Sequence, residues 1–198
     1  AARLFSAGIP IAMLGSWQEG VTAIRRFGVR MIDHDGALLT YPVQIFSDHQ
    51  LLKNIPFAIV LVKSYQTARA ASQLVECLSP DGLLLTLQNG IGNRELYEHY
   101  LGRERVSVGV TTTGATQIKP GMVEPAGEGP IFLSQHARLD GLRKYLNQAQ
   151  FQLEIIEDAE SLLWSKLVIN AAINPLTALL RLPTGEFLAR PGARDLLR

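Results

Sequence analysis

The residues with the clearest chemical potential lie between Trp164 and Thr177, where a lysine and two asparagines recur at one interval. Lys166, Asn170 and Asn174 are each separated by four positions. Four residues of an α-helix return to within about 40° of the starting direction, so the three side chains share one stripe. An ammonium group can donate a proton, and carboxamides can orient carbonyl, hydroxyl or carboxylate oxygens. The spacing therefore predicts a site for a small polar ligand, with Lys166 as a proton donor.

Two structural alternatives compete with this ligand site. Each residue taken alone fits a solvated side chain on an exposed helix face, and Asn174 could instead cap a helix break at Pro175. Asn is a mediocre helix former that favours caps and turns. Two asparagines in register with a lysine, inside a segment rich in Ala, Ile and Leu, favour the ligand site over both alternatives.

A second candidate site is the loop Gln88–Asn93, which follows an apolar strand pattern and precedes a helical pattern. Ligands bind at the carboxyl ends of strands in open α/β sheets, and glycines such as Gly90 let the backbone approach a ligand closely. Asn89 can offer its amide to such a ligand, although an Asn-Gly turn that caps the next helix is the alternative. Lys63 follows another apolar run at the same edge of the expected sheet, where it either reaches the cleft or is an ordinary surface lysine.

The elements that must position these residues alternate between strand and helix patterns. Continuous apolar runs predict strands covered on both faces, and the alternation predicts an α/β fold of βαβ units with a mostly parallel sheet. We expect strands at 11–14, 57–62, 83–87, 106–113, 122–133 and 152–156, and a hairpin of 29–32 and 37–45 around Asp35-Gly36. We expect helices at 17–27, 66–78, 93–101 and 139–150, with turns at 79–82 and 119–121.

The pattern changes near residue 157. Residues 159–180 form one long helical pattern with Pro175 as a kink or break, followed by a turn at 182–186 and a further helix. Forty residues of helix and turn cannot close a core alone. We therefore expect two domains, an α/β domain at 1–157 and the beginning of an all-helical domain at 158–198. Residues 1–5 have the pattern of a helix end, so we expect further residues before them and the rest of the helical domain after Arg198.

Composition argues against several functional classes. The 19 basic and 18 acidic residues leave a net charge of +1, and the cations are scattered, so we expect no nucleic-acid partner. No apolar run reaches the ~18–20 residues of a membrane span, and no cationic leader precedes an apolar run, so we expect no membrane partner. Cys77 is the only cysteine, which suits a reducing cytoplasm; we expect a buried, inert thiol, with a catalytic thiol as the alternative. We expect no metal site, because no ligand spacing joins the histidines His34, His49, His99 and His136.

Together these segments resemble the ketopantoate reductase family over essentially the whole chain. The resemblance rests on the block Lys-x3-Asn-x3-Asn-Pro-Leu-Thr-Ala from Lys166, the Gln-Asn-Gly-x-Gly loop from Gln88, and the segment 114–133 with its Pro-Gly turn. It implies a Rossmann-type NADP-binding domain, here lacking its first strand and glycine turn, then the start of a helical substrate domain. The implied reaction is NADPH-dependent reduction of 2-dehydropantoate to pantoate, in pantothenate and coenzyme A biosynthesis. The implied enzyme is cytoplasmic, and a homodimer is one possible assembly.

The resemblance also implies roles for the substrate-side residues. Lys166 would be the proton donor and a substrate contact, and Asn170 and Asn174 would hold the keto acid. Thr184 stands where the family has a further substrate-contacting asparagine, so its contact with the substrate would differ from the family's.

On the cofactor side, the resemblance implies that Asn89 and Ala115 contact the dinucleotide and that Lys63 lies near its nicotinamide end. The arginine that the family often places after its second strand to meet the 2′-phosphate has no counterpart at Gly15-Ser16-Trp17. A preference for NADP is therefore implied by the family and not by these residues.

Alternatives stay open at this point. One is a reductase of another small 2-keto acid within the same family, and the other is a non-catalytic binding or assembly module that keeps the fold. Sister folds such as the 3-hydroxyacid and glycerol-3-phosphate dehydrogenases also place a lysine in a helical half, but the Asn-Pro-Leu-Thr block from Asn174 argues against them.

Overall fold

The computed structural model of the protein describes residues 1–33 and 35–196. Its helices are α1 (Ala2–Ser6), α2 (Gln18–Phe27), α3 (Thr67–Cys77), α4 (Asn93–Leu101), α5 (Leu139–Gln148), α6 (Ala159–Leu180), α7 (Thr184–Leu188) and α8 (Ala193–Leu196). Its strands are β1 (Ala12–Leu14), β2 (Val29–Ile32), β3 (Leu38–Tyr41), β4 (Gln44–Phe46), β5 (Ile55–Val60), β6 (Leu78–Thr86), β7 (Val106–Thr111), β8 (Gly114–Lys119), β9 (Met122–Gly127), β10 (Ile131–Ser134) and β11 (Leu153–Ile156).

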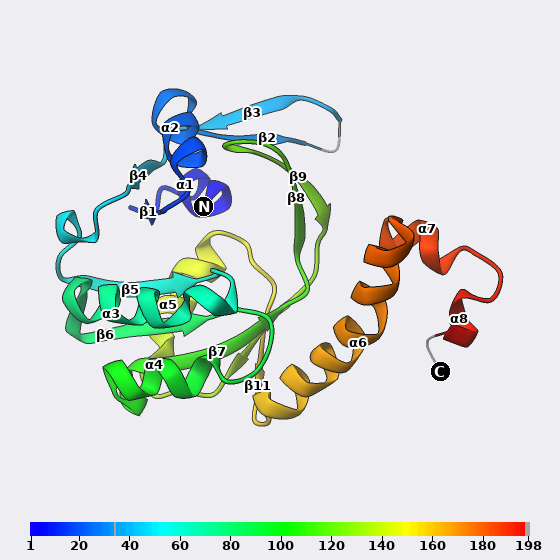
Figure 1. The fold of residues 1–198 in the computed structure, drawn as a ribbon. Helices are drawn as coiled ribbons and strands as arrows, with labels where there is room; N and C mark the ends of the chain where they lie inside the picture. Colours follow the sequence, from blue (N-terminus) through cyan, green and yellow to red (C-terminus); the bar gives the residue numbers. More distant parts are fainter. Residues whose placement is uncertain (34, 197–198) are drawn as a thin grey trace.

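The central sheet has five strands in the order β11-β10-β7-β6-β5 (Figure 1). Strands β5, β6 and β7 are parallel, and β11 is parallel to β10, so only the β7–β10 pair is antiparallel. The predicted α/β fold with a mostly parallel sheet, followed by a helical segment, is confirmed. Because β5, β6 and β7 run the same way, their carboxyl ends meet at one edge of the sheet.

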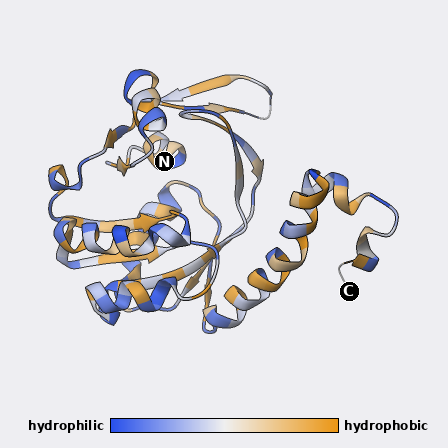
Figure 2. Cartoon of the chain, viewed as in Figure 1, coloured by the Kyte–Doolittle hydropathy of each residue, from blue (hydrophilic) through white to orange (hydrophobic). Residues whose placement is uncertain are grey.

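Strand β6 is buried on both faces, and its leucines alternate between two apolar layers. Leu83 and Leu85 pack with the leucines of α5, whereas Leu84 packs with Ala71 of α3 and Tyr97 of α4. Figure 2 shows hydrophobic strands at this level and helices with mixed hydrophilic and hydrophobic faces around them. This two-sided burial is why the sequence shows a continuous apolar run here instead of an alternating one.

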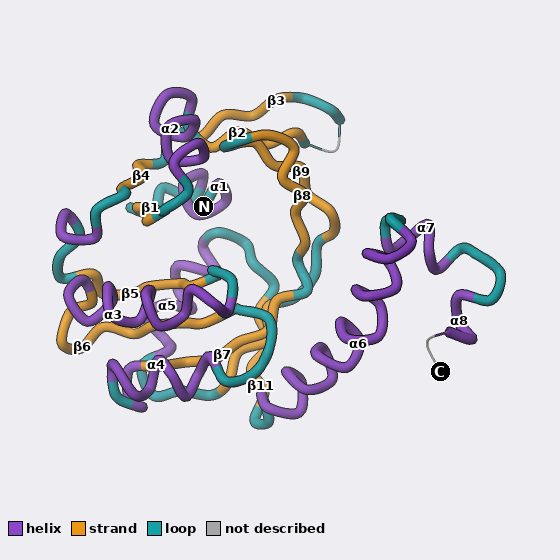
Figure 3. The backbone as a smooth tube through the Cα atoms, in the orientation of Figure 1, coloured by secondary structure: helices purple, strands orange, loops and turns teal. Residues whose placement is uncertain are grey.

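Two smaller sheets accompany the central sheet. Strands β1 and β4 form a parallel pair, and β3, β2, β9 and β8 form a sheet in that order. The predicted hairpin turn is present, because the Asp33 carboxylate accepts hydrogen bonds from the backbone amides of Asp35 and Ala37. Figure 3 shows β8 and β9 as a long hairpin that leaves the central sheet and reaches β2.

Several predicted boundaries were wrong where strands change sheets. The single strand expected at 37–45 is two strands, β3 and β4, because Pro42 offers no amide and β4 pairs with β1. The single strand expected at 122–133 is β9 and β10, which belong to different sheets, and β8 was not predicted.

The two other turns that differ from expectation lie within or beside regular elements. The expected turn at 79–82 lies inside β6, where a register shift against β5 between Ile55 and Phe57 accommodates Pro80. The turn expected at 182–186 gives way to α7 at Thr184.

Helix α6 runs without a break from Ala159 to Leu180, with Pro175 inside it. The side chain of Asp158 accepts a hydrogen bond from the Ser161 amide and so caps the first turn. The first turns contact β7 and β10, and the rest extends away from the sheet (Figure 1). By length and composition this helix could also cross a membrane, a test that core helices of water-soluble proteins pass as well.

Gly28 supplies a fold prediction, because it ends α2 with a φ of 73° and its missing Cβ would lie 2.5 Å from the Tyr41 carbonyl oxygen. Gly36 in the same hairpin has a φ of 79° but no described atom within 4 Å of that position. Both alanine variants pay about 1 kcal/mol of left-handed strain, and only Gly28→Ala adds an overlap worth about 1–3 kcal/mol. Urea denaturation should therefore show Gly28→Ala as clearly less stable than Gly36→Ala. Equal losses would contradict the close approach to Tyr41.

Candidate site at the carboxyl edge of the central sheet

The loop Gln88–Asn93 connects the carboxyl end of β6 to α4, as predicted. Gly90 and Gly92 have φ values of 91° and 84°, which L-residues rarely adopt, and a Cβ at Gly92 would meet no described atom within 4 Å. Gly92, and not Asn89, is the N-cap of α4, so the alternative of an Asn-Gly cap is wrong. Asn89 is exposed, and the hydrogen bonds it makes in the described structure use its backbone carbonyl. Its side-chain amide is therefore available to a ligand.

Lys63 follows β5 at the same edge of the sheet and is exposed. Its neighbour Ser64 donates a hydrogen bond of 3.2 Å to the Asn89 carbonyl oxygen. The loop after β5 and the loop after β6 are thus in direct contact, which brings two of the sequence-predicted residues to one place.

Lys166 also reaches this edge, from α6. Its Nζ donates a hydrogen bond of 2.7 Å to the carbonyl oxygen of Thr111, the last residue of β7. The side chain is half-buried, and this burial lowers the pKa of Lys166 below the ordinary lysine value of 10.5. One of the three ammonium hydrogens is used by Thr111, so the group can still donate to a ligand.

Asn170 and Asn174 follow Lys166 at one and two turns along the unbroken helix. Asn170 is half-buried, Asn174 is exposed, and neither side-chain amide has a hydrogen-bond partner in the described residues. The continuity of α6 through Pro175 argues against the alternative in which Asn174 caps a helix break. The stripe therefore offers free amides on the helix face that begins at the lysine.

Ala115 and Thr184 are placed differently. Ala115 is exposed on β8, four residues past Thr111, and pairs with Pro125 of β9. Thr184 is the first residue of α7, at the end of α6 remote from the sheet (Figure 1). The structure does not bring Thr184 to the sheet edge that holds Lys63 and Asn89.

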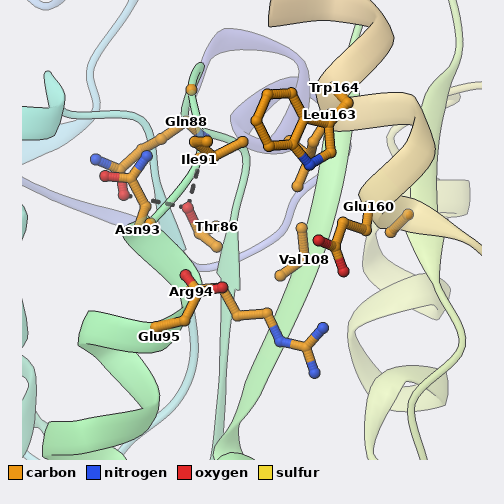
Figure 4. Close-up of a pocket in the computed structure, with 13 residues that line it drawn as sticks. Thr86, Gln88, Ile91, Asn93, Arg94, Glu95, Val108, Glu160, Leu163 and Trp164 are labelled. Atoms are coloured by element: carbon orange, nitrogen blue, oxygen red, sulfur yellow. Dashed lines mark hydrogen bonds between the residues drawn. The ribbon is translucent and has the colours of Figure 1, made fainter.

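A cavity of about 300 Å³ lies between the start of α4 and the first turns of α6 (Figure 4). Trp164 and Leu163 from α6 lie next to Ile91 of the loop, and Glu160 and Arg94 line the same cavity from opposite sides (Figure 4). Its lining includes most of the predicted loop Gln88–Asn93 but none of Lys63, Asn89 and Lys166, so the cavity overlaps the predicted site only in part. The α6 side of the cavity, at Glu160, Leu163 and Trp164, was not predicted as part of a site. Its full lining is Thr86, Gln88, Gly90, Ile91, Gly92, Asn93, Arg94, Glu95, Val108, Ala159, Glu160, Leu163 and Trp164.

Neither a reactive thiol nor a metal cluster is found among the described residues. Cys77 is buried, and burial raises the pKa of its thiol, which disfavours the nucleophilic thiolate. Among residues 1–33 and 35–196 no group of three His, Cys, Asp or Glu side chains could hold a metal ion. His34 lies outside the described residues.

Comparisons with known proteins identify the family. The family model described as Ketopantoate reductase PanE/ApbA matches residues 1–138, and its C-terminal counterpart matches residues 158–198. The chain belongs to the ketopantoate reductase family. It is 31% identical over 196 residues to the 2-dehydropantoate 2-reductase of Halobacterium salinarum, covering 95% of this chain and 64% of that protein. It is 37% identical over 144 residues to the Archaeoglobus fulgidus protein of the same name, covering 70% of this chain and 48% of that protein.

The chain therefore spans about half to two thirds of the length of these family members. Among solved structures it is similar to 2-dehydropantoate 2-reductase from Geobacter metallireducens, with 27% identity, a TM-score of 0.84 and coverage of 99% of this chain and 66% of that one. A ternary structure of D-mandelate dehydrogenase with NADH and anilino(oxo)acetate has a TM-score of 0.89 at 20% identity, covering 99% and 65%. That second likeness concerns the fold alone.

Proposed function

We propose that the protein to which this chain belongs reduces 2-dehydropantoate to pantoate, with a reduced nicotinamide dinucleotide, NADPH, as hydride donor. The observation that carries the proposal is the contact between Lys166 Nζ and the Thr111 carbonyl oxygen. It brings the lysine of the Lys-Asn-Asn stripe to the sheet edge at which α/β folds bind their ligands. Membership of the family, and relatives named 2-dehydropantoate 2-reductase, support the same reaction.

The residues of this chain have separate parts in that reaction. A reduced nicotinamide held beside Asn89 and Lys63 would supply the hydride for the keto carbon. Lys166 holds a proton at Nζ and donates it to the substrate carbonyl oxygen, a transfer favoured by the lowered pKa of its ammonium group. Asn170 and Asn174 orient the substrate through side-chain amides that have no other partner in the described structure.

The loop after β6 fits a nicotinamide dinucleotide. A Cβ at Gly92 would meet no described atom within 4 Å, so the backbone there is open, and Asn89 and Lys63 are exposed beside it. We therefore propose Asn89 and Lys63 as cofactor contacts, with Ala115 on β8 as a third. Thr184 is a weaker substrate contact in this proposal, since it lies on α7.

The residues expected near the adenosine end of the cofactor give no sign of a preference for the 2′-phosphate of NADPH. The residues after β1 are Gly15-Ser16-Trp17, without a cation, and the Arg25 guanidinium is already bonded to the Ile45 carbonyl and the Ser47 hydroxyl. The choice of NADPH over NADH thus rests on the family. Because D-mandelate dehydrogenase, which has a similar fold, was solved with NADH, any assay should test both NADPH and NADH.

The remaining assignments are proposals of the same kind. We divide the chain into a nucleotide-binding domain at 1–157 and the beginning of a helical substrate domain at 158–198, supported by the separate family matches. We place the enzyme in the cytoplasm, supported by the one cysteine of this chain, which is unpaired. We also propose a homodimer; the apolar side chains that α6 exposes, among them Val168 and Leu179, need a cover that the rest of the helical domain or a second subunit would supply. The primary experiment is oxidation of NADPH and NADH by the full gene product with a panel of 2-keto acids.

Replacing the proton donor should stop turnover while leaving cofactor binding intact. In the full gene product, Lys166→Met should lower kcat by about 10²–10⁴, the usual cost of losing a general acid. The dissociation constant of NADPH, measured by fluorescence, should stay within about twofold because the lysine acts on the keto acid. Lys144→Met, at an exposed position of α5, is the matched control and should retain wild-type kinetics. A fully active Lys166→Met enzyme would place the proton donor elsewhere.

The pH profile should report the lysine directly. A general acid works only while protonated, so kcat/KM should be flat at low pH and fall about tenfold per unit above the pKa of Lys166. Because burial lowers that pKa, the fall should begin below pH 10.5. This alkaline limb should be missing from the residual activity of Lys166→Met. A wild-type profile that stays flat up to pH 10.5 would rule out Lys166 as the titrating donor.

Asn174→Ala should separate substrate binding from scaffolding. Loss of one hydrogen-bond partner costs about 1–3 kcal/mol, or roughly five- to a hundredfold in kcat/KM for the keto acid, expressed mainly as a higher KM. Stability should change little, because Ala is the better helix former. The NADPH dissociation constant should not change. Asn147→Ala on α5 is the control, and a lower melting temperature with unchanged KM would instead assign Asn174 a structural role.

A further inference from the structure

We propose that Gln88, through a buried network with Thr67 and Asn93, is the positioning residue that holds the Lys63 loop and the Asn89 loop in one fixed arrangement for the cofactor. This inference rests on the proposed function, since it assumes that these two loops bind the dinucleotide. The proposed function itself uses none of Gln88, Thr67 and Asn93, which lie behind the residues proposed to bind the ligands.

Gln88 joins the ends of two parallel strands. It is 6% exposed, and its Nε2 donates a hydrogen bond of 2.9 Å to the carbonyl oxygen of Val62, the residue before Lys63. Its Oε1 accepts 3.1 Å from the Thr86 hydroxyl at the end of β6. One side chain therefore ties the segment after β5 to the segment after β6.

The same amide passes the connection on to the helices. Gln88 Nε2 also donates a hydrogen bond of 3.0 Å to Thr67 Oγ1, and Thr67 Oγ1 donates one of 2.8 Å to Asn93 Oδ1. Thr67 begins α3 and Asn93 begins α4, and they are 1% and 7% exposed. Asn93 Nδ2 then donates 3.2 Å to the Asn89 carbonyl oxygen. The chain of bonds thus ends on the residue proposed to touch the cofactor.

The hydrogen bonds of this network all run in the same direction from donor to acceptor. The Thr86 hydroxyl donates to Gln88, Gln88 to Thr67, Thr67 to Asn93, and Asn93 to the loop carbonyl. No member can rotate without leaving a buried donor or acceptor unpaired, which is costly at such depth. The network therefore fixes a loop whose two left-handed glycines, Gly90 and Gly92, would otherwise leave its backbone free to vary.

A purely structural role is the competing explanation, and it makes different predictions. Buried amides need partners wherever they lie, so a network that only fills the core would cost stability when broken and leave cofactor affinity alone. A positioning network must cost cofactor affinity, because a disordered loop has to be ordered again each time the dinucleotide binds.

The test uses a matched pair at Thr67 in the full gene product. Thr67→Val keeps the side-chain shape but removes both bonds, whereas Thr67→Ser keeps the hydroxyl. Thr67→Val and Gln88→Met should each raise the NADPH dissociation constant about tenfold, with kcat at saturating NADPH and the KM of the keto acid within about twofold. Thr67→Ser should bind NADPH within about twofold of wild type. The double variant should be no worse than the weaker-binding single variant, since the bonds act in series.

Two controls complete the design. Ser107→Ala removes a buried hydroxyl of β7 that is not part of the network, and it should leave NADPH affinity unchanged whatever it does to stability. Ser64→Ala removes the bond that Ser64 donates to the Asn89 carbonyl and the 3.5 Å bond that it accepts from Asn93 Nδ2, so it should raise the dissociation constant about two- to fivefold, even if the buried variants fail to fold. Amide hydrogen exchange of residues 89–93 should be faster in Thr67→Val than in Thr67→Ser.

The outcomes separate the two levels of the proposal. If wild type binds NADPH or NADH but Thr67→Val, Gln88→Met and Ser64→Ala bind it equally well, the positioning role is wrong and the proposed function stands. If wild type binds neither dinucleotide and reduces no 2-keto acid, the proposed function itself is wrong, and the cofactor role of the network falls with it. Affinity that is lost in Thr67→Val and regained in Thr67→Ser supports both.

Discussion

The arrangement of this protein depends on the burial of β6 on both of its faces. Leu83, Leu84 and Leu85 are fully buried, and they can be so only if helices cover the sheet on either side. Helices that return the chain to the same end of the sheet make β5, β6 and β7 parallel. Parallel strands in turn release their loops at one edge. The proximity of the loops carrying Lys63 and Asn89 is thus a consequence of apolar burial, and polar chemistry is added to an edge that packing has already defined.

The polar groups at that edge are of two kinds. Gln88, Thr67 and Asn93 are buried and have partners, so their free energy depends on staying together. The side chains of Asn89 and Asn170 have no hydrogen-bond partner among the residues that the structure describes, so a ligand can bind them without breaking a described internal hydrogen bond. In such a site the buried residues hydrogen-bond to one another and hold the loop, while the exposed side chains remain available for the ligand.

The sequence predicted those parts of the fold in which one element has one environment. Helices 93–101 and 159–180 were placed at their observed bounds, and the apolar runs of β5, β6 and β7 were recognised because two-sided burial leaves an unbroken hydrophobic pattern. The errors fall where the chain leaves one sheet for another, at 37–45 and 122–133, because residues in both sheets carry similar apolar side chains. Strand β8 was missed for a different reason: it is largely exposed, so it lacks the apolar pattern of a buried strand, although its hairpin partner β9 follows directly in the sequence.

The site was predictable to the extent that helical spacing determines it. The row of Lys166, Asn170 and Asn174 follows from intervals of four, and an unbroken α6 preserves it. The Thr111 carbonyl, 55 residues away in sequence, could not be found that way. Nor could the network behind Asn89, since a buried glutamine looks like any surface glutamine until its neighbours are known. Spacing identifies residues on one element, whereas partners across elements require the fold.

Burial and the Thr111 contact act on different properties of Lys166. Burial disfavours the charged ammonium and lowers its pKa, while the Thr111 carbonyl oxygen, 2.7 Å from Nζ, accepts one of its hydrogens. The hydrogen bond fixes where the proton is held, and the desolvation determines how readily it leaves. A keto oxygen that gains negative charge beside this group becomes a far better proton acceptor than the Thr111 carbonyl, which is never basic enough to take the proton. The carbonyl can therefore orient the ammonium between turnovers without competing for its proton during them.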